Sequence, residues 1–164
     1  MNESLIVNAS PLIFLINAGQ IDLLRATGAS RVIVPQSVID EVIATQHDDR
    51  AAREIAESTW IERASPIDIP PSIIEWDLGP GESRVIAVAL ATPGARPVID
   101  DLLGRRCALA LGLNVMGTLG VVVAAHRSGH VDDVRRVILN LRTSGMWLSD
   151  AVVEQALRLA NYKK

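Results

Sequence analysis

Short apolar runs alternate with longer amphipathic stretches along this chain. The short runs are rich in β-branched residues and are bounded by proline, glycine or polar residues. Brief runs that are apolar throughout are typical of strands buried on both faces of a parallel sheet. We therefore predict strands at residues 4–8 (SLIVN), 31–35 (RVIVP), 97–100 (PVID) and 114–117 (NVMG).

The longer stretches predict helices, and several of them begin with residues that favour a helix N-terminus. Ser149 precedes DAVVEQALRLA and Asp132 precedes DVRRVILNL, while a GPGE turn precedes SRVIAVALA. Serine and aspartate favour this position because their side-chain oxygens accept hydrogen bonds from unpaired backbone N–H groups. We expect helices at about 11–17, 20–27, 36–45, 48–58, 82–91, 102–111, 118–128, 132–142 and 149–160.

Segment 64–81 interrupts the alternation with four prolines and two glycines. Too few strands lie on either side of it for each half to form its own sheet, so we interpret it as a connection within one domain. The prediction is a single domain over residues 1–164, with a three-layer α/β/α fold. Its central sheet is mostly parallel and has four or five strands.

Composition narrows the classes of function. The chain is 49% hydrophobic, but no apolar stretch is long enough to cross a membrane, and no basic stretch precedes the first apolar run as in a secretion signal. We therefore expect a cytoplasmic protein with no membrane partner. Cys107 is the single cysteine, which excludes an internal disulfide and a cysteine-based zinc site. A net charge of -3 and 3% aromatic residues argue against a generally basic or base-stacking RNA surface.

Polar residues gather where the predicted strands end. In open α/β sheets, ligands bind just beyond the carboxyl ends of the strands. Oxygen-bearing side chains at such positions suit a hard cation such as Mg²⁺ or Mn²⁺, which usually keeps several waters. The candidates after the strands or in the helices that follow them are Asn8, Ser10, Glu41, Glu82, Asp100 and Asp101.

Each of these residues also has an ordinary structural interpretation. Asn8 or Ser10 could cap a helix that begins at Pro11, and Glu82 could favour the N-terminus of its own helix through the helix dipole. Glu41 could be a solvated helix residue. Adjacent carboxylates at the end of an apolar strand repel one another, so one of the Asp100–Asp101 pair could cap the next helix while the other faces water.

Two other function classes can be rejected. In a phosphoacceptor receiver domain, an acidic pair such as VIDD closes the first of about five strand–helix units, whereas only 64 residues follow Asp100. A phosphate-binding P-loop would require Lys-Ser or Lys-Thr after the glycines of GPGES, and this chain has neither there.

Over nearly its whole length the chain resembles PIN-domain proteins of the VapC-like type, the toxins of bacterial toxin–antitoxin pairs. The resemblance rests on the order and spacing of VNASPLIFLINAGQIDLL, VIVPQSVIDEV, LGPGESRVIAVAL, VIDDLLGRRCALALGLNVMGTLGVVVAA and GMWLSD. It implies the same α/β fold and the chemistry of a divalent-metal-dependent ribonuclease that uses Mg²⁺ or Mn²⁺.

The resemblance also implies which residues would form the site. The acid that usually ends the first strand falls on Asn8, whose amide oxygen can bind a metal or orient its water but brings no charge. The hydroxyl beside it falls on Ser10, and the remaining acids fall on Glu41, Glu82 and either Asp100 or Asp101.

Further implied contacts concern the substrate and the partners. Arg105 and Arg106 could meet the RNA backbone, and Thr118 would add a hydroxyl near the site. The resemblance implies an RNA substrate, a small antitoxin and a homodimer. Because Asn8 is neutral, an alternative stays open: a PIN-like module that binds RNA or a protein partner without cleaving RNA.

Overall fold

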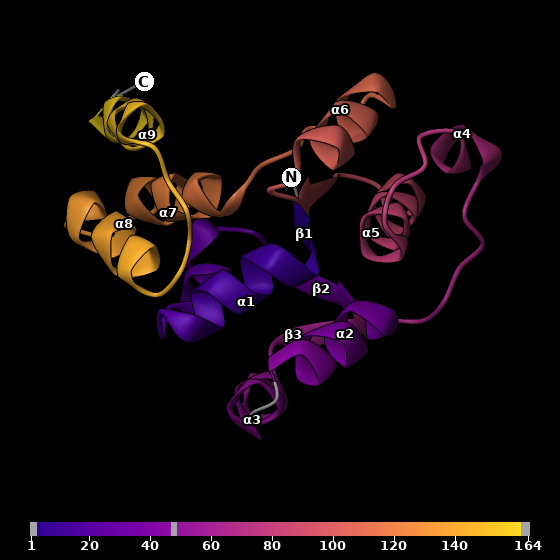
Figure 1. The fold of residues 1–164 in the computed structure, drawn as a ribbon, viewed down its shortest axis with the longest axis horizontal. Coiled ribbons are helices and arrows are strands. Elements are labelled where there is room, and N and C mark those ends of the chain that lie inside the picture. The colour runs from indigo at the N-terminus through magenta and orange to yellow at the C-terminus, as the bar shows by residue number, and fades with distance from the viewer. Residues whose placement is uncertain (1–2, 47–48, 162–164) are drawn as a thin grey trace.

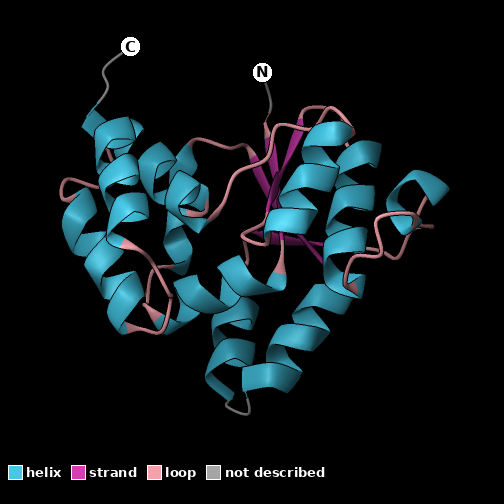
Figure 2. Cartoon of the chain, turned by 45° about the horizontal axis from the view of Figure 1, so that its top comes forward, coloured by secondary structure: helices cyan, strands magenta, loops and turns pink. Residues whose placement is uncertain are grey.

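The computed structural model describes residues 3–46 and 49–161, and it contains one four-stranded sheet in which every strand pair is parallel. The strand order is β3-β2-β1-β4, and an isolated bridge from Val98 to Met116 continues the sheet beyond β4. Figure 2 shows the strands lying between helices. The predicted three-layer α/β/α fold is thereby confirmed. The strands are β1 (Ser4–Val7), β2 (Arg31–Pro35), β3 (Ile61–Ala64) and β4 (Ala95–Val98).

The central strands are apolar because helices cover both of their faces. All four residues of β1 are buried, and Ile6 lies between Ile33 of β2 and Pro97 of β4. In Figure 1, α5 lies on one side of the sheet and α1 on the other. The helices of this first group are α1 (Ala9–Asn17), α2 (Gln36–Gln46), α3 (Asp49–Glu57), α4 (Pro71–Ile74) and α5 (Pro80–Ala91).

The C-terminal part of the chain is helical; its first helix packs against α5, and its two middle helices pack against α1. Its caps agree only partly with the sequence prediction. Ser149 Oγ accepts from Val152 N at 3.3 Å, as predicted, whereas the N-cap before the next-to-last helix is Asp133 rather than Asp132. These helices are α6 (Leu102–Ala110), α7 (Thr118–Arg127), α8 (Val134–Thr143) and α9 (Asp150–Asn161).

Several predicted elements were wrong. The stretch 20–27 forms two short 3₁₀ turns, η1 (Ile21–Leu23) and η2 (Arg25–Thr27), rather than one helix. The strand expected at 114–117 is reduced to the bridge at Met116, and β4 begins two residues before its predicted start. The segment 64–81 contains the short α4. Residue 48, the first residue of the helix predicted over 48–58, lies outside the described residues.

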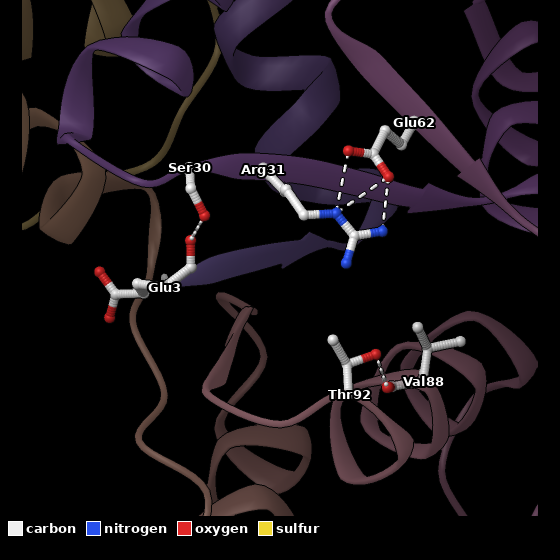
Figure 3. A network of polar contacts seen from close by, with 6 residues as sticks. All are labelled: Glu3, Ser30, Arg31, Glu62, Val88 and Thr92. Carbon is white, nitrogen blue, oxygen red and sulfur yellow. Dashed lines mark hydrogen bonds and ion pairs between the residues drawn. The ribbon is translucent and has the colours of Figure 1, made fainter. Parts of the chain in front are cut away.

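Strand β3 was missed because it is an edge strand without an apolar run. Its two end residues are half-buried and its two central residues are exposed, and Glu62 accepts hydrogen bonds from Arg31 on β2 (Figure 3). The shortest of these joins Arg31 Nη2 to Glu62 Oε2 at 2.6 Å. The pair therefore ties the edge strand to its neighbour through side chains that a search for apolar patterns does not detect.

One hydrophobic cluster runs through the described chain from β1 to α9. Across residues 3–46 and 49–161, none of the helices has both the length and the apolar character that crossing a bilayer requires.

Candidate metal centre

Most of the predicted site residues lie near the carboxyl ends of β1 and β4. The chain runs outward from β1 through β2 to β3 and then returns to place β4 on the other side of β1. The place where strand order reverses is the usual ligand position in open α/β sheets, and we call this edge of the sheet, between the ends of β1 and β4, the crevice. Asn8 follows β1 directly, and its backbone N–H donates to Val98 O at 3.1 Å. The two strand ends are thus joined at the crevice.

Asn8 is 2% exposed, and its side chain bonds to an acid rather than to the helix that it precedes. Its Nδ2 donates to Glu82 Oε1 at 3.1 Å, across 74 positions of sequence. Because an ionised carboxylate only accepts hydrogen bonds, this contact requires the amide nitrogen to face Glu82. The other amide atom, Oδ1, is buried and has no hydrogen-bond partner among the described residues. A buried polar atom left in this way normally has a partner such as an ion or a water.

Gly81 leaves open the space at which Asn8 and Glu41 converge. A Cβ on Gly81 would lie 2.9 Å from Glu41 Oε2 and 3.2 Å from Asn8 Oδ1. Glu41 is carried there by α2, and Glu82 by the first turn of α5. The carboxylate of Glu82 folds back over Gly79, where a Cβ would overlap Oε2. Gly79 therefore leaves room for Glu82, and Gly81 leaves room for Glu41 and Asn8, so that three oxygen-bearing side chains lie around the GPGE turn.

The two adjacent aspartates have different local roles. Asp101 is the N-cap of α6, and its Oδ1 accepts from Gly104 N at 2.8 Å. Asp100 is held instead by Thr118, whose N–H donates to Oδ1 at 2.8 Å and whose Oγ1 donates to Oδ2 at 2.6 Å. Thr118 is completely buried, so its hydroxyl serves Asp100. The suggestion that one aspartate of the pair caps the next helix therefore holds for Asp101.

Each of the two aspartates lies close to a glycine, Asp101 to Gly104 and Asp100 to Gly117, and a second charged side chain lies close to the same glycine. A Cβ on Gly104 would lie 3.3 Å from Glu82 Cγ and 3.6 Å from Asp101 Oδ1. A Cβ on Gly117 would lie 2.7 Å from Asp100 Oδ1 and 3.0 Å from Arg105 Nη1. The half-buried guanidinium of Arg105, which donates to Ile99 O at 3.2 Å, therefore lies beside the same glycine as the Asp100 carboxylate.

The remaining predicted residues lie at the surface. Ser10 is exposed in the first turn of α1, and Arg106 is exposed on α6. Neither is linked to the acids by a contact like that between Asn8 and Glu82. The glycines that shape the crevice were not singled out from the sequence, although the GPGE turn beside a candidate acid was the available signal.

The donor set fits a hard cation that keeps part of its water shell. Within residues 3–46 and 49–161, no three His, Cys, Asp or Glu side chains are grouped closely enough to hold an ion by themselves. The unpartnered amide oxygen of Asn8 offers a neutral candidate ligand near Glu41 and Glu82, beside Gly81. These ligands are all oxygens, as Mg²⁺ and Mn²⁺ prefer, and waters would complete the coordination.

Comparison with known proteins identifies the family to which the chain belongs. A family model described as PIN domain matches residues 4–162, which is nearly the whole chain. Among curated proteins, no sequence matches this one.

Proposed function

This chain belongs to the PIN-domain family, and from that premise we propose that it is a divalent-metal-dependent ribonuclease that hydrolyses RNA phosphodiester bonds. Membership of the family indicates nuclease chemistry, RNA binding and divalent metal ions in general. The observation that carries the specific proposal is the buried Asn8 Oδ1, which lacks a partner within the described part of the chain and lies beside Glu41 Oε2 over Gly81.

We assign Asn8, Glu41 and Glu82 to holding Mg²⁺ or Mn²⁺. When bound, the ion would supply an activated water and positive charge to the transition state. Asp100 would add a further carboxylate to Glu41 and Glu82, and we call these three acids the acidic wall. Thr118 fixes both oxygens of Asp100, one of which lies beside Gly117. Asp101 would contribute negative charge while it caps α6.

Substrate contacts fall to the residues around this acidic wall. Arg105 lies beside Asp100 and would meet a phosphate of the RNA backbone next to the bound ion, where its positive charge offsets the acids. Arg106 and Ser10 are exposed and would contact the backbone farther out. We assign Thr118 to positioning Asp100, since a completely buried hydroxyl does not reach RNA.

We further propose that the protein is a toxin of the VapC-like type, that it acts as a homodimer in the cytoplasm and that a small antitoxin neutralises it. The order and spacing of the motifs from VNASPLIFL to GMWLSD support this part. A single-domain organisation over residues 1–164 is supported by the hydrophobic cluster that extends from β1 to α9.

A second candidate function is an RNA-binding or protein-binding module that does not cleave. It is favoured by the neutral Asn8 and by the lack of a three-acid cluster among the described residues. The two candidates differ in whether RNA is hydrolysed when a divalent ion is present.

The test is cleavage of labelled RNA with Mn²⁺, Mg²⁺ or EDTA, together with calorimetric titration of each ion into the protein. Glu41→Gln should abolish both ion binding and cleavage. Asp40→Asn is the matched control, because it removes one charge at the neighbouring position of α2, where Asp40 accepts from Gln36 on the exposed surface. Ion-dependent cleavage lost in Glu41→Gln and kept in Asp40→Asn supports the ribonuclease. RNA binding without cleavage under any ion supports the binding module.

A further inference from the structure

Asn8 does more than offer an oxygen to an ion, because its side chain also fixes an acid of the site. The Nδ2–H donates to Glu82 Oε1 at 3.1 Å, and Asn8 is 2% exposed. A primary amide has a donor side and an acceptor side. The bond to Glu82 therefore also turns Oδ1 toward Gly81, where a Cβ would lie 3.2 Å from it. A single contact sets the orientation of two ligands.

An aspartate at position 8 would create a different situation in the same backbone. Two carboxylates would then face each other at the 3.1 Å separation now spanned by a hydrogen bond. Like charges that close, with one of them buried, repel strongly because the surroundings screen them poorly. A cation between the carboxylates removes that repulsion. The folded protein would then depend on the ion to hold the crevice together.

We propose that Asn8 is a positioning residue that holds Glu82 in its binding position in the ion-free protein, so that the fold does not depend on the ion. The identity of the ion site rests on the proposed function, whereas the Asn8–Glu82 hydrogen bond does not. The arrangement lowers the negative charge of the site by one unit. The ion consequently binds more weakly than it would beside an aspartate and exchanges readily with the surroundings.

The test is thermal unfolding in EDTA and in excess Mn²⁺, which reports on the fold without any need for nuclease activity. Asn8→Asp should lower Tm in EDTA by at least about 5 °C, since breaking a buried polar pair is costly in a chain of this size. Added Mn²⁺ should raise Tm of Asn8→Asp by more than it raises that of the wild type.

Two further variants sharpen the comparison. Asn8→Asp/Glu82→Gln exchanges donor and acceptor, so an amide–carboxylate hydrogen bond can form again, and Tm in EDTA should recover. The matched control is Asn140→Asp, because Asn140 Nδ2 donates to Ala18 O at 2.9 Å, away from the candidate ion ligands. That change should lower Tm equally in EDTA and in Mn²⁺. If Asn8→Asp does not fold in EDTA, the exchanged pair carries the test.

The outcomes separate this inference from the proposed function. If Asn8→Asp in EDTA is as stable as the wild type, or if the exchanged pair recovers nothing, Asn8 does not hold Glu82 and the inference is overturned. If Mn²⁺ changes Tm in none of the proteins, the proposed ion site is overturned, and the comparison in EDTA still decides the role of Asn8. Loss of stability in EDTA that the exchanged pair restores supports the inference.

Discussion

Gly81→Ala is the smallest change that should empty the proposed ion site. It alters no charge and removes no hydrogen-bonding side chain. The added Cβ would lie 2.9 Å from Glu41 Oε2 and 3.2 Å from Asn8 Oδ1, which is closer than carbon and oxygen normally approach. Each oxygen would therefore have to move away from the new Cβ by a few tenths of an ångström.

The size of the effect follows from which oxygen can move. Glu41 is exposed at the end of a flexible side chain, so it can rotate away. Asn8 is buried and bonded to Glu82, so it cannot move with Glu41. Functional metal sites tolerate deviations of about 0.2 Å in ligand distance. We expect affinity for Mn²⁺ to fall at least about tenfold, equivalent to roughly 1.4 kcal/mol.

The same substitution should leave the fold intact or slightly more stable. Alanine in place of glycine stabilises a helix interior by roughly 0.5–1 kcal/mol, and Gly81 lies in the first turn of α5, where the gain is smaller and offsets part of the strain from the added Cβ. Loss of affinity combined with an unchanged or raised Tm would thus separate the site from the fold.

Calorimetric titration of Mn²⁺ into wild type and Gly81→Ala measures the affinity directly. Gly120→Ala is the control, because Gly120 is also a helical glycine and its Cβ would press against Met116 Cβ at 3.0 Å, away from the acids. It should change stability and leave Mn²⁺ affinity alone. Gly81→Ala that binds Mn²⁺ as tightly as the wild type would refute the assignment of Asn8 and Glu41 as ligands to one ion.

Three other expectations follow from single contacts. Thr118→Val removes the hydroxyl that donates to Asp100 Oδ2 at 2.6 Å, so thermal unfolding should show a loss of about 1.5–3 kcal/mol, or roughly 3–12 °C in Tm, and Thr118→Ser should lose less. The hydrogen bond from Arg31 lowers the pKa of the Glu62 carboxyl. The contribution of this pair to the free energy of unfolding is therefore present above the ordinary pKa of glutamate and is lost as pH falls through the lowered value. Denaturant unfolding should accordingly distinguish Glu62→Gln from wild type near neutral pH and not in acid. Burial raises the pKa of the Cys107 thiol, and Cys107 is 0% exposed, so a thiol reagent should label it only after unfolding, as mass spectrometry would show.

The parts of the fold that could be predicted from sequence are the buried elements, because their residues are almost all apolar. β1 and β2 are apolar on both faces, which few arrangements other than a covered parallel sheet explain. β3 could not be found in this way, since its residues IERA are half-buried or exposed and it pairs with β2 across about 30 positions of sequence, from Val32–Ile61 to Pro35–Ala64. The stretch 20–27 has a helical composition, yet it forms two 3₁₀ turns. The second of them ends at Gly28, whose φ is 89°.

In the candidate site, too, the sequence indicates the kind of residue but not the partner to which each side chain bonds. The sequence indicates which residues carry oxygen at strand ends, and Asn8, Glu82 and Asp100 all lie at the crevice. It could not indicate which aspartate of the pair caps a helix. That choice depends on a hydrogen bond between Asp100 and Thr118, 18 positions apart, which forms only when the segment after α6 returns to the sheet.

Glycine placement distinguishes the two candidate functions better than charge does. A module that only bound RNA or protein would need no empty space between its acids, and ordinary side chains could fill the crevice. Here Gly81 and Gly117 each lie where a Cβ would press on oxygens of the site, at 2.9 Å from Glu41 and 2.7 Å from Asp100. The position beside Gly81 is bounded by oxygens, one of which, Asn8 Oδ1, has no partner among the residues described, whereas the position beside Gly117 also meets Arg105 Nη1 at 3.0 Å. Oxygens placed in this way around Gly81 suit a hydrated cation. Under the proposed function we therefore interpret the neutral Asn8 as a ligand of weaker charge rather than as the remnant of a lost site.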